Sequence, residues 1–415
     1  MEQKESDAVD KAGTLIARFE KSFLGVRSTF HPPGIQGEIA GKSSNVAFAA
    51  RHIVQVHRAE LSAGICNVLV TVMDADTHLW QDYFTELRRL HTTNLPETAD
   101  LTLYTCPIIF DRNAHESPLL VRCADLLWAF AGLSTMYPGT RISIPTSVYS
   151  LPLSLAERVG GWDSGPTAIG EDMHMLLKCY FETAGNLVSR VVYVPASQCN
   201  VSGDRTSTTP STKGKTSWAK FRQTMDTCHA RYRQALRHMW GALDSGFATR
   251  RTISYLRLHS RCLFLRPRHL ALLHLLFEAH FLPTHLTLLM LFSASYEMLT
   301  RSSTLHPTLR STFQVTAILR TISFLGMNLC LALYERWHAL CLETRQADMR
   351  AANVNDTGFA VRAWWKGKFL LERVCFPVAG TVFGAVPTLH AVFAHFWTDR
   401  LVYRVSRKPD FASLV

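Results

Sequence analysis

The chain has 415 residues, enough for one large domain or two ordinary ones, and it carries a net charge of +11 at pH 7. This charge could indicate a nucleic-acid-binding protein, but the Lys and Arg residues gather beside apolar segments, in 250–268 and 362–373. Basic residues next to apolar runs are typical of the cytosolic loops of membrane proteins, so we expect a lipid membrane as a partner and no nucleic acid.

The first 250 residues alternate between helical and strand patterns, as α/β domains do. An apolar, β-branched strand is predicted at 67–73, directly before Asp74, Ala75 and Asp76. Because buried parallel strands present polar groups at their carboxyl ends, we expect 67–73 to be a strand of this kind. The other predicted elements are helices at 11–24 and 41–60, strands at 101–110 and 141–150 with a helix at 118–132 between them, and helices at 171–182 and 218–243.

Apolar segments follow the α/β domain at 270–293, 313–334 and 375–397. The last two are long enough to cross a hydrocarbon core of about 30 Å, whereas 270–293 contains Glu278 and suits either a span or an interfacial helix. The prolines and glycines of 375–397 favour a kinked or re-entrant helix pair, and a plain span is the alternative.

Charge predicts the orientation in the membrane. The loop 294–312 is poor in Lys and Arg, so we expect it outside and the α/β domain in the cytosol. Cysteines without a C-x-x-C pair also fit a reducing compartment. The predicted layout is an α/β domain at 1–250, a basic interfacial linker at 251–268, a transmembrane region at 269–400 and a basic tail at 401–415.

Two pairs of acidic residues are candidates for chemistry. Asp74 and Asp76 at a strand terminus can reach one divalent cation, although an N-cap Asp with a solvated neighbour explains them equally well. Glu171 and Asp172 begin a predicted helix, where acids often only cap the helix, but where a general base would also be held beside an acceptor hydroxyl.

A basic helix supplies the third candidate. Gln234 and Arg237 share one helical face, and Trp240 lies a step further along it. This face could offer an amide, a guanidinium for a diphosphate and an aromatic plate for a sugar ring. A solvated basic helix is the alternative for this segment alone.

The order of these motifs resembles the membrane-bound, processive family 2 glycosyltransferases, which include cellulose, chitin and hyaluronan synthases. The blocks GKSSNVAFAAR, DADTHLWQDYF, IGEDMHMLLKCYF and RYRQALRHMWG carry the resemblance, which is nearest to a fungal branch. It implies an A-type, Rossmann-like glycosyltransferase domain followed by membrane helices. It also implies an inverting enzyme that moves a hexose from a nucleotide sugar, expected to be a UDP-sugar, to a hydroxyl of a polysaccharide or lipid acceptor.

The resemblance also implies residue roles. Asp172 would be the general base, supported by Glu171. Asp74 and Asp76 would bind Mg²⁺ or Mn²⁺ and the donor diphosphate, with Asp76 the more direct ligand. The remaining roles are donor binding by Lys42, Gln234 and Arg237, and acceptor binding by Trp240, His238 and Trp162.

Two features depart from the family pattern. His238 follows Arg237 where the family has Trp, which shifts the expected sugar platform. Only 41 residues precede Lys42, and they contain no convincing apolar strand, so the domain is expected to lack its first strands. The alternative function is therefore a truncated, catalytically inactive membrane pseudo-transferase.

Overall fold

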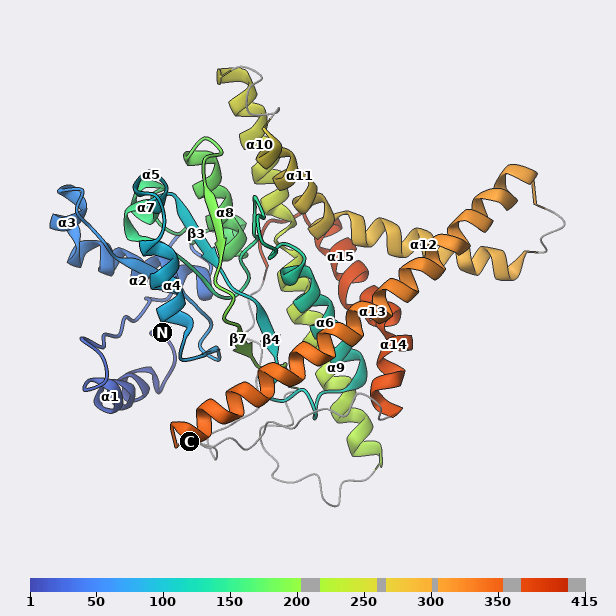
Figure 1. The fold of residues 1–415 in the computed structure, drawn as a ribbon, viewed down its shortest axis with the longest axis horizontal. Coiled ribbons are helices and arrows are strands. Elements are labelled where there is room, and N and C mark those ends of the chain that lie inside the picture. The colour runs from blue at the N-terminus through green and yellow to red at the C-terminus, as the bar shows by residue number, and fades with distance from the viewer. Residues whose placement is uncertain (203–216, 260–265, 301–304, 354–366, 402–415) are drawn as a thin grey trace.

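The computed structural model describes residues 1–202, 217–259, 266–300, 305–353 and 367–401. It has an α/β part, built by the N-terminal half of the chain, and a set of long helices beside it (Figure 1). The helices of the N-terminal half are α1 (Ala8–Phe19), α2 (Lys42–Val56), α3 (Arg58–Ser62), α4 (Tyr83–Thr92), α5 (Pro96–Ala99), α6 (Leu119–Leu133), α7 (Leu153–Arg158), the short 3-10 helix Pro166–Ala168 and α8 (Glu171–Glu182).

The larger sheet has four strands in the order β1 (Leu69–Val72), β5 (Tyr149–Pro152), β3 (Thr102–Thr105) and β6 (Val188–Val191). β1 pairs with β5 in antiparallel orientation, and only Val72 of its residues is fully buried. The prediction of a buried parallel strand at 67–73 was therefore wrong, although the strand itself is present. An apolar run indicates burial and extension, but it does not encode the direction of the neighbouring strand.

A smaller sheet has the order β2 (His78–Leu79), β7 (Ala196–Gln198) and β4 (Ile108–Phe110). The predicted strand 101–110 is thus divided between two sheets. Pro107 lies at the division, and because proline has no N–H to donate, a continuous ladder is not favoured there. The predicted strand 141–150 is irregular up to Val148, in keeping with Pro145, and only its last two residues enter β5.

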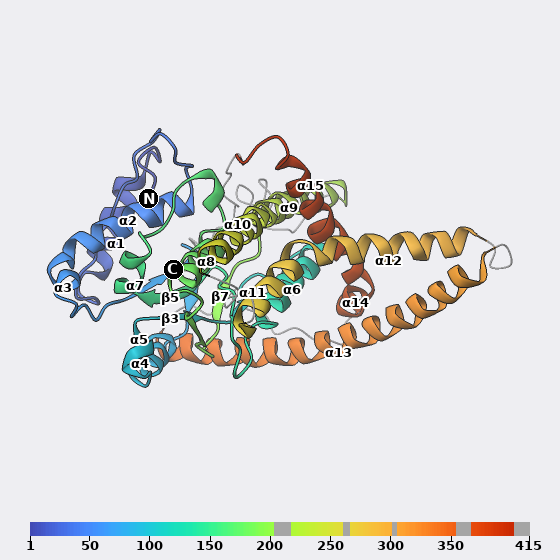
Figure 2. The same ribbon diagram turned by 90° about the horizontal axis from the view of Figure 1, so that it is seen from above.

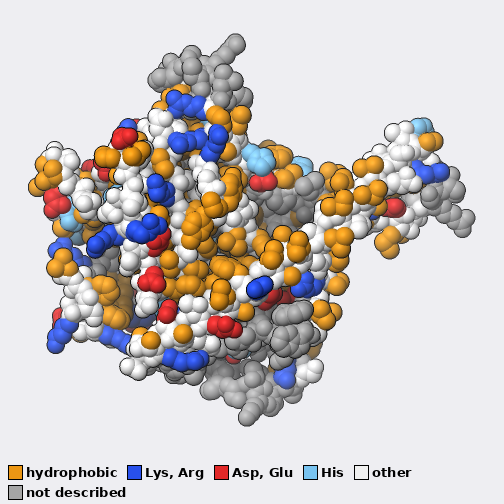
Figure 3. All heavy atoms as spheres, viewed as in Figure 1, with side chains coloured by type: hydrophobic (Ala, Val, Ile, Leu, Met, Phe, Trp, Pro, Cys, Tyr) orange, Lys and Arg blue, Asp and Glu red, His pale blue; other side chains and the backbone are white. Residues whose placement is uncertain are grey.

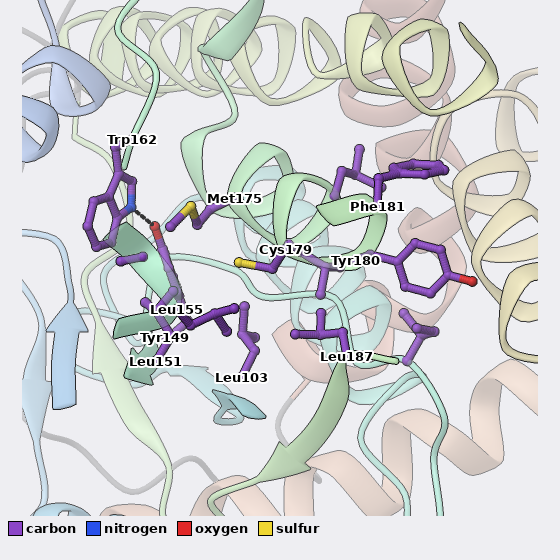
Figure 4. Close-up of a cluster of buried hydrophobic side chains, with 14 of the residues drawn as sticks. Leu103, Tyr149, Leu151, Leu155, Trp162, Met175, Cys179, Tyr180, Phe181 and Leu187 are labelled. Atoms are coloured by element: carbon purple, nitrogen blue, oxygen red, sulfur yellow. Dashed lines mark hydrogen bonds between the residues drawn. The ribbon is translucent and has the colours of Figure 1, made fainter. Parts of the chain in front are cut away.

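The core of the α/β part lies between α8 and the larger sheet. Leu103, Leu151 and Leu187 come from the sheet region, and Met175 and Cys179 project toward them from α8 (Figure 4). These side chains are almost fully buried, which supplies the main driving force for fixing α8 on the sheet. The core therefore determines where the first residues of α8 lie.

The C-terminal helices are α9 (Ser217–Met239), α10 (Ala242–His259), α11 (Pro267–His280), α12 (Leu282–Leu299), α13 (Pro307–Ala351), α14 (Gly367–Gly380) and α15 (Val386–Ala394), with a π-helical segment at Thr381–Ala385. The apolar segment 270–293 is not one helix, because the chain turns between α11 and α12 at Phe281. Leu272 and Leu276 of α11 are buried in the same core as α8. The first half of this segment therefore packs on the α/β part.

The segment 375–397 is helical from α14 through the π-helical segment to the end of α15. It forms one helical run and not a re-entrant pair of helices. Phe376 and Phe383 pack with Cys123 and Leu126 of α6, so this run lies against the α/β part. Except for Leu401, the basic tail 401–415 lies outside the described residues.

α12 and the first half of α13 form an arm that projects away from the rest of the molecule in both views (Figures 1 and 2). Hydrophobic side chains are exposed along it, among them Phe292, Ile318 and Leu325 (Figure 3). Arg320 joins the two helices through an ion pair of 2.8 Å to Glu297. An exposed apolar surface of this length is what a lipid-facing segment presents.

The second half of α13 is different, because it docks on the α/β part. Glu335 of α13 forms an ion pair of 3.4 Å with the buried Arg122 of α6. Arg345 of α13 pairs with Asp111, which follows β4. Within the described residues, the helices Pro307–Ala351 and Leu370–Ala394 are long and apolar enough to cross a membrane. One continuous helix therefore connects a candidate span to the α/β part.

Candidate active site

Lys42 brings two of the predicted acidic motifs together. It is the first residue of α2, and its Nζ lies 2.9 Å from Oδ1 of Asp74 and 3.0 Å from Oε1 of Glu171. Asp74 follows β1 and Glu171 begins α8, so three distant segments meet at one ammonium group. Burial alone would lower the pKa of Lys42, but the carboxylates of Glu171 and Asp74 outweigh it and raise that pKa. The lysine therefore stays charged and holds the two acids in place.

The Asp74–Asp76 loop is anchored on the smaller sheet. The side-chain amide of Gln198 donates to Thr77 at 2.6 Å and to Ser147 at 3.0 Å. Oδ2 of Asp76 accepts a long hydrogen bond from the backbone N–H of Cys199, at 3.4 Å. These contacts connect the loop after β1 to the end of β7, which limits the positions that its carboxylates can take.

The start of α8 holds the predicted base. Glu171 is buried and Asp172 half-buried, and Oδ1 of Asp172 accepts a hydrogen bond of 2.8 Å from the backbone N–H of Met173. Burial, followed by the neighbouring charge of Glu171, raises the pKa of Asp172 well above its ordinary value. Burial also raises the pKa of Glu171, although Lys42 opposes this shift. A carboxylate with a raised pKa is a stronger acceptor of a proton than one in water.

A buried histidine clamps the start of α8 to the start of α10. Nδ1 of His174 lies 2.6 Å from Asp244, and its Nε2 lies 2.9 Å from Asp163, which also pairs with Lys178. Burial lowers the pKa of His174, but the two carboxylates outweigh it and raise that pKa to about 9. The imidazole is therefore a charged link between three segments, one turn along α8 from Glu171.

The predicted Q-x-x-R helix is α9, and its Gln234 is engaged inside the protein. Gln234 is buried, and its Oε1 accepts a hydrogen bond of 2.5 Å from Arg231. Arg231 in turn pairs with Asp125 of α6 at 3.2 Å. Arg237, one turn further on, is half-buried. The structure therefore does not bring Gln234 to the Lys42 cluster in this conformation.

The aromatic candidates lie in packing positions. Trp240 is buried, its indole N–H donates to the Asp399 carbonyl at 3.1 Å, and its ring meets His395 edge-on. Trp162 is buried in the core, where its indole N–H donates to the Tyr149 hydroxyl at 2.6 Å (Figure 4). Neither ring therefore presents an open face on which a sugar could stack in this structure.

His238 stacks on Trp128 of α6, with ring centroids 4.4 Å apart. Its place is thus also one of helix packing, between α9 and α6. The three predicted acceptor side chains thus pack on neighbouring helices or in the core, and Trp240 directly precedes Gly241, which lies beside Gly170 ahead of Glu171.

The comparisons with known proteins identify the family. The model of the family described as Glycosyl transferase family group 2 matches residues 69–334, which is more than half of the chain. The chain belongs to this family. The matched region contains the acids of both motifs and the Q-x-x-R helix, whereas Lys42 precedes it. A comparison with curated proteins gave no match.

Membership of this family makes the protein a glycosyltransferase, which takes a nucleotide-sugar donor and an acceptor. The cluster of Lys42, Asp74 and Glu171 combines a cation, which a nucleoside diphosphate needs, with acids that need counterions. Asp74 and Asp76 supply hard carboxylate oxygens at the end of β1, the ligand type that Mg²⁺ and Mn²⁺ prefer. In the described part of the chain, no group of three or more His, Cys, Asp or Glu residues is assembled as a metal site. The two aspartates therefore fit a cation whose other ligands would come from diphosphate and water.

Sequence reasoning missed residues that the fold brings close to this cluster. His174 lies within the recognised block GEDMH, three residues after Glu171, so helical spacing could have placed it on the same face. Arg112 follows the apolar strand β4, just as the aspartates follow β1. Its proximity to Asp76, at 4.0 Å, depends on how the two sheets are arranged. That arrangement has no signal in the sequence.

Proposed function

We propose that this glycosyltransferase is an inverting hexosyltransferase of the membrane. It would move a hexose from a nucleotide sugar, in our proposal a UDP-sugar, to a hydroxyl of a polysaccharide or lipid acceptor. The observation that carries the proposal is the meeting of Lys42, Asp74 and Glu171, with Asp172 next in the chain. A donor-binding loop and a base are thereby held at one place by a half-buried cation.

In the proposed reaction, the acceptor hydroxyl attacks the anomeric carbon from the face opposite the diphosphate. The new carbon–oxygen bond forms while the bond to the diphosphate oxygen breaks, and its electron pair leaves with the nucleoside diphosphate. The hydroxyl proton passes to the carboxylate of Asp172, whose raised pKa suits it for general-base catalysis. Glu171 stays paired with Lys42, which holds the start of α8.

Asp74 and Asp76 would hold Mg²⁺ or Mn²⁺ in this proposal. A bound divalent cation would neutralise charge on the departing diphosphate. Lys42 would add positive charge at the same place, because it is charged and lies 2.9 Å from Asp74. These cationic groups act where negative charge develops, which is the most effective position for electrostatic catalysis.

We also propose that the catalytic part faces the cytosol at the membrane. The exposed apolar arm and the run Leu370–Ala394 support membrane insertion. Both lie on the side of the molecule away from α1–α5 (Figure 2). A lipid or growing polysaccharide acceptor would then meet the site close to the bilayer surface.

The experiment for the proposed function replaces Asp172 with Asn and measures hexose transfer and donor binding separately. Loss of a general base lowers turnover by about 10²–10⁴-fold. Donor binding should change little, because the ion pairs of Lys42 are with Asp74 and Glu171 and not with Asp172. Transfer is followed by release of UDP from a UDP-hexose, and binding by calorimetry with Mn²⁺ present.

Asp82→Asn is the matched control, because this exposed aspartate makes no side-chain capping bond at the start of α4. Near-normal turnover of Asp172→Asn would contradict its role as the base. Failure of the wild-type protein to bind any nucleotide sugar would favour the alternative, a membrane protein that does not catalyse transfer.

A further inference from the structure

Arg112 occupies a position that the roles above do not explain. It follows β4, and its neighbours on both sides are held firmly. Asp111 accepts a hydrogen bond from Ser197 at 2.7 Å, and the side chain of Asn113 is bonded to the backbone of Asn200 at both of its ends, at 2.8 and 3.1 Å. The backbone that carries Arg112 is therefore fixed to β7 and the residues that follow it.

The guanidinium of Arg112 has unused donors. Its side chain is only 18% exposed, and its Nη2 lies 4.0 Å from Oδ2 of Asp76, too far for a hydrogen bond. Its Nε and Nη2 are buried and have no hydrogen-bond partner in the described part of the chain. Buried donors without partners are unfavourable, and a guanidinium fork matches the oxygens of a phosphate. A phosphate group at this place would satisfy these donors.

The surroundings of Arg112 also favour an anion. Asp111, the carboxylate next to it in the chain, pairs with Arg345 instead. Among the described residues, Asp74 faces Lys42 and Asp76 faces Arg112.

We propose that Arg112 binds the diphosphate of the nucleotide-sugar donor through its Nε and Nη2. This inference rests on the proposed function for the nature of the ligand. Without donor, Asp76 is the counterion of Arg112. When the phosphate oxygens of the donor pair with the guanidinium, the carboxylate of Asp76 becomes available to a divalent cation. Arg112 is then a determinant of donor affinity that neither acidic motif contains.

The test compares wild-type protein with Arg112→Gln and Arg112→Lys, each as the full chain in detergent. Binding of inorganic pyrophosphate and of UDP is measured by calorimetry with Mg²⁺ present. Loss of charge-assisted hydrogen bonds predicts affinities for both ligands that are about tenfold lower, or more, in Arg112→Gln. Arg112→Lys should retain part of the affinity, because it keeps the charge without the fork. Arg89→Gln is the matched control, since Arg89 is exposed and pairs with Glu86 on α4.

The outcomes separate this inference from the proposed function. Unchanged affinities in Arg112→Gln, with normal transfer, would overturn the inference and leave the proposed function standing. Pyrophosphate binding that depends on Arg112, without UDP-hexose binding or transfer, would support the anion site and refute the function. Wild-type protein that binds neither ligand would overturn the inference. Thermal unfolding of each variant tests for misfolding. If Arg112→Gln does not fold, the comparison of Arg112→Lys with the wild-type protein decides the outcome.

Discussion

His174 offers the sharpest test of how the site is held in place. Both of its ring nitrogens contact carboxylates, and the pKa of the ring is raised from 6.5 to about 9 by Asp163 and Asp244, despite burial. At about 1.4 kcal/mol per pKa unit, this shift corresponds to about 3 kcal/mol of stability at low pH. Replacing His174 with Gln removes that contribution and leaves Asp244, which is 1% exposed, without its cation.

The sign of the pH dependence follows from the direction of the shift. Because the pKa of His174 is higher in the folded state, its stabilisation is complete below pH 6.5 and is lost as the pH rises through about 9. Asp163 behaves oppositely, because the hydrogen bond from His174 lowers its pKa to about 2. Its contribution is present above pH 3.8 and is lost as the pH falls toward 2.

The assay is thermal unfolding of the detergent-solubilised protein at pH 6.5 and pH 9. At about 2 °C per kcal/mol, the wild-type midpoint should fall by roughly 6 °C more between these pH values than that of His174→Gln. His57→Gln is the control, since His57 pairs only with the exposed Glu60 in the described structure. If the midpoint of His174→Gln falls as much between pH 6.5 and pH 9 as the wild-type midpoint, the charged link of His174 to Asp163 and Asp244 is refuted.

The remaining predictions concern the metal and the membrane. Asp76→Ala should abolish nucleotide binding that depends on Mg²⁺ or Mn²⁺; calorimetry that shows equal wild-type binding with a chelator present would argue against the metal. Leu319→Lys and Leu325→Lys place a charge at positions that are 55% and 63% exposed on the arm. Because each charge costs about 2.5–3.5 kcal/mol in a span, these variants should be released from membranes during alkaline extraction. Thr308→Lys, in the first turn of α13, should not be released, and full retention of the Leu319→Lys and Leu325→Lys variants would exclude the arm as a span.

Local chemistry allowed much of the site to be predicted. The acids after the apolar run 67–73 and at the start of α8 lie where the sequence pattern placed them, because strand and helix ends are marked by local composition. The helices 118–132 and 171–182 were also confirmed, as α6 and α8. Such features depend on neighbours a few residues away, so one sequence is enough to recognise them.

The pairing of strands could not be predicted in the same way. The antiparallel partner of β1 and the division of 101–110 between two sheets depend on contacts between residues far apart in the chain. The same is true of Trp162, whose aromatic ring gives no local sign of whether it faces a ligand or the core. In the fold it lies in the core, bonded to Tyr149.

The sequence by itself therefore determined the chemical groups, their order and the apolar segments that favour a membrane. Tertiary structure alone decided which groups meet: Lys42 with Asp74 and Glu171, His174 with Asp244, and Arg112 near Asp76. The reason is that a buried charge must find its counterion, and the packing of α8 and the two sheets determines which one is within reach.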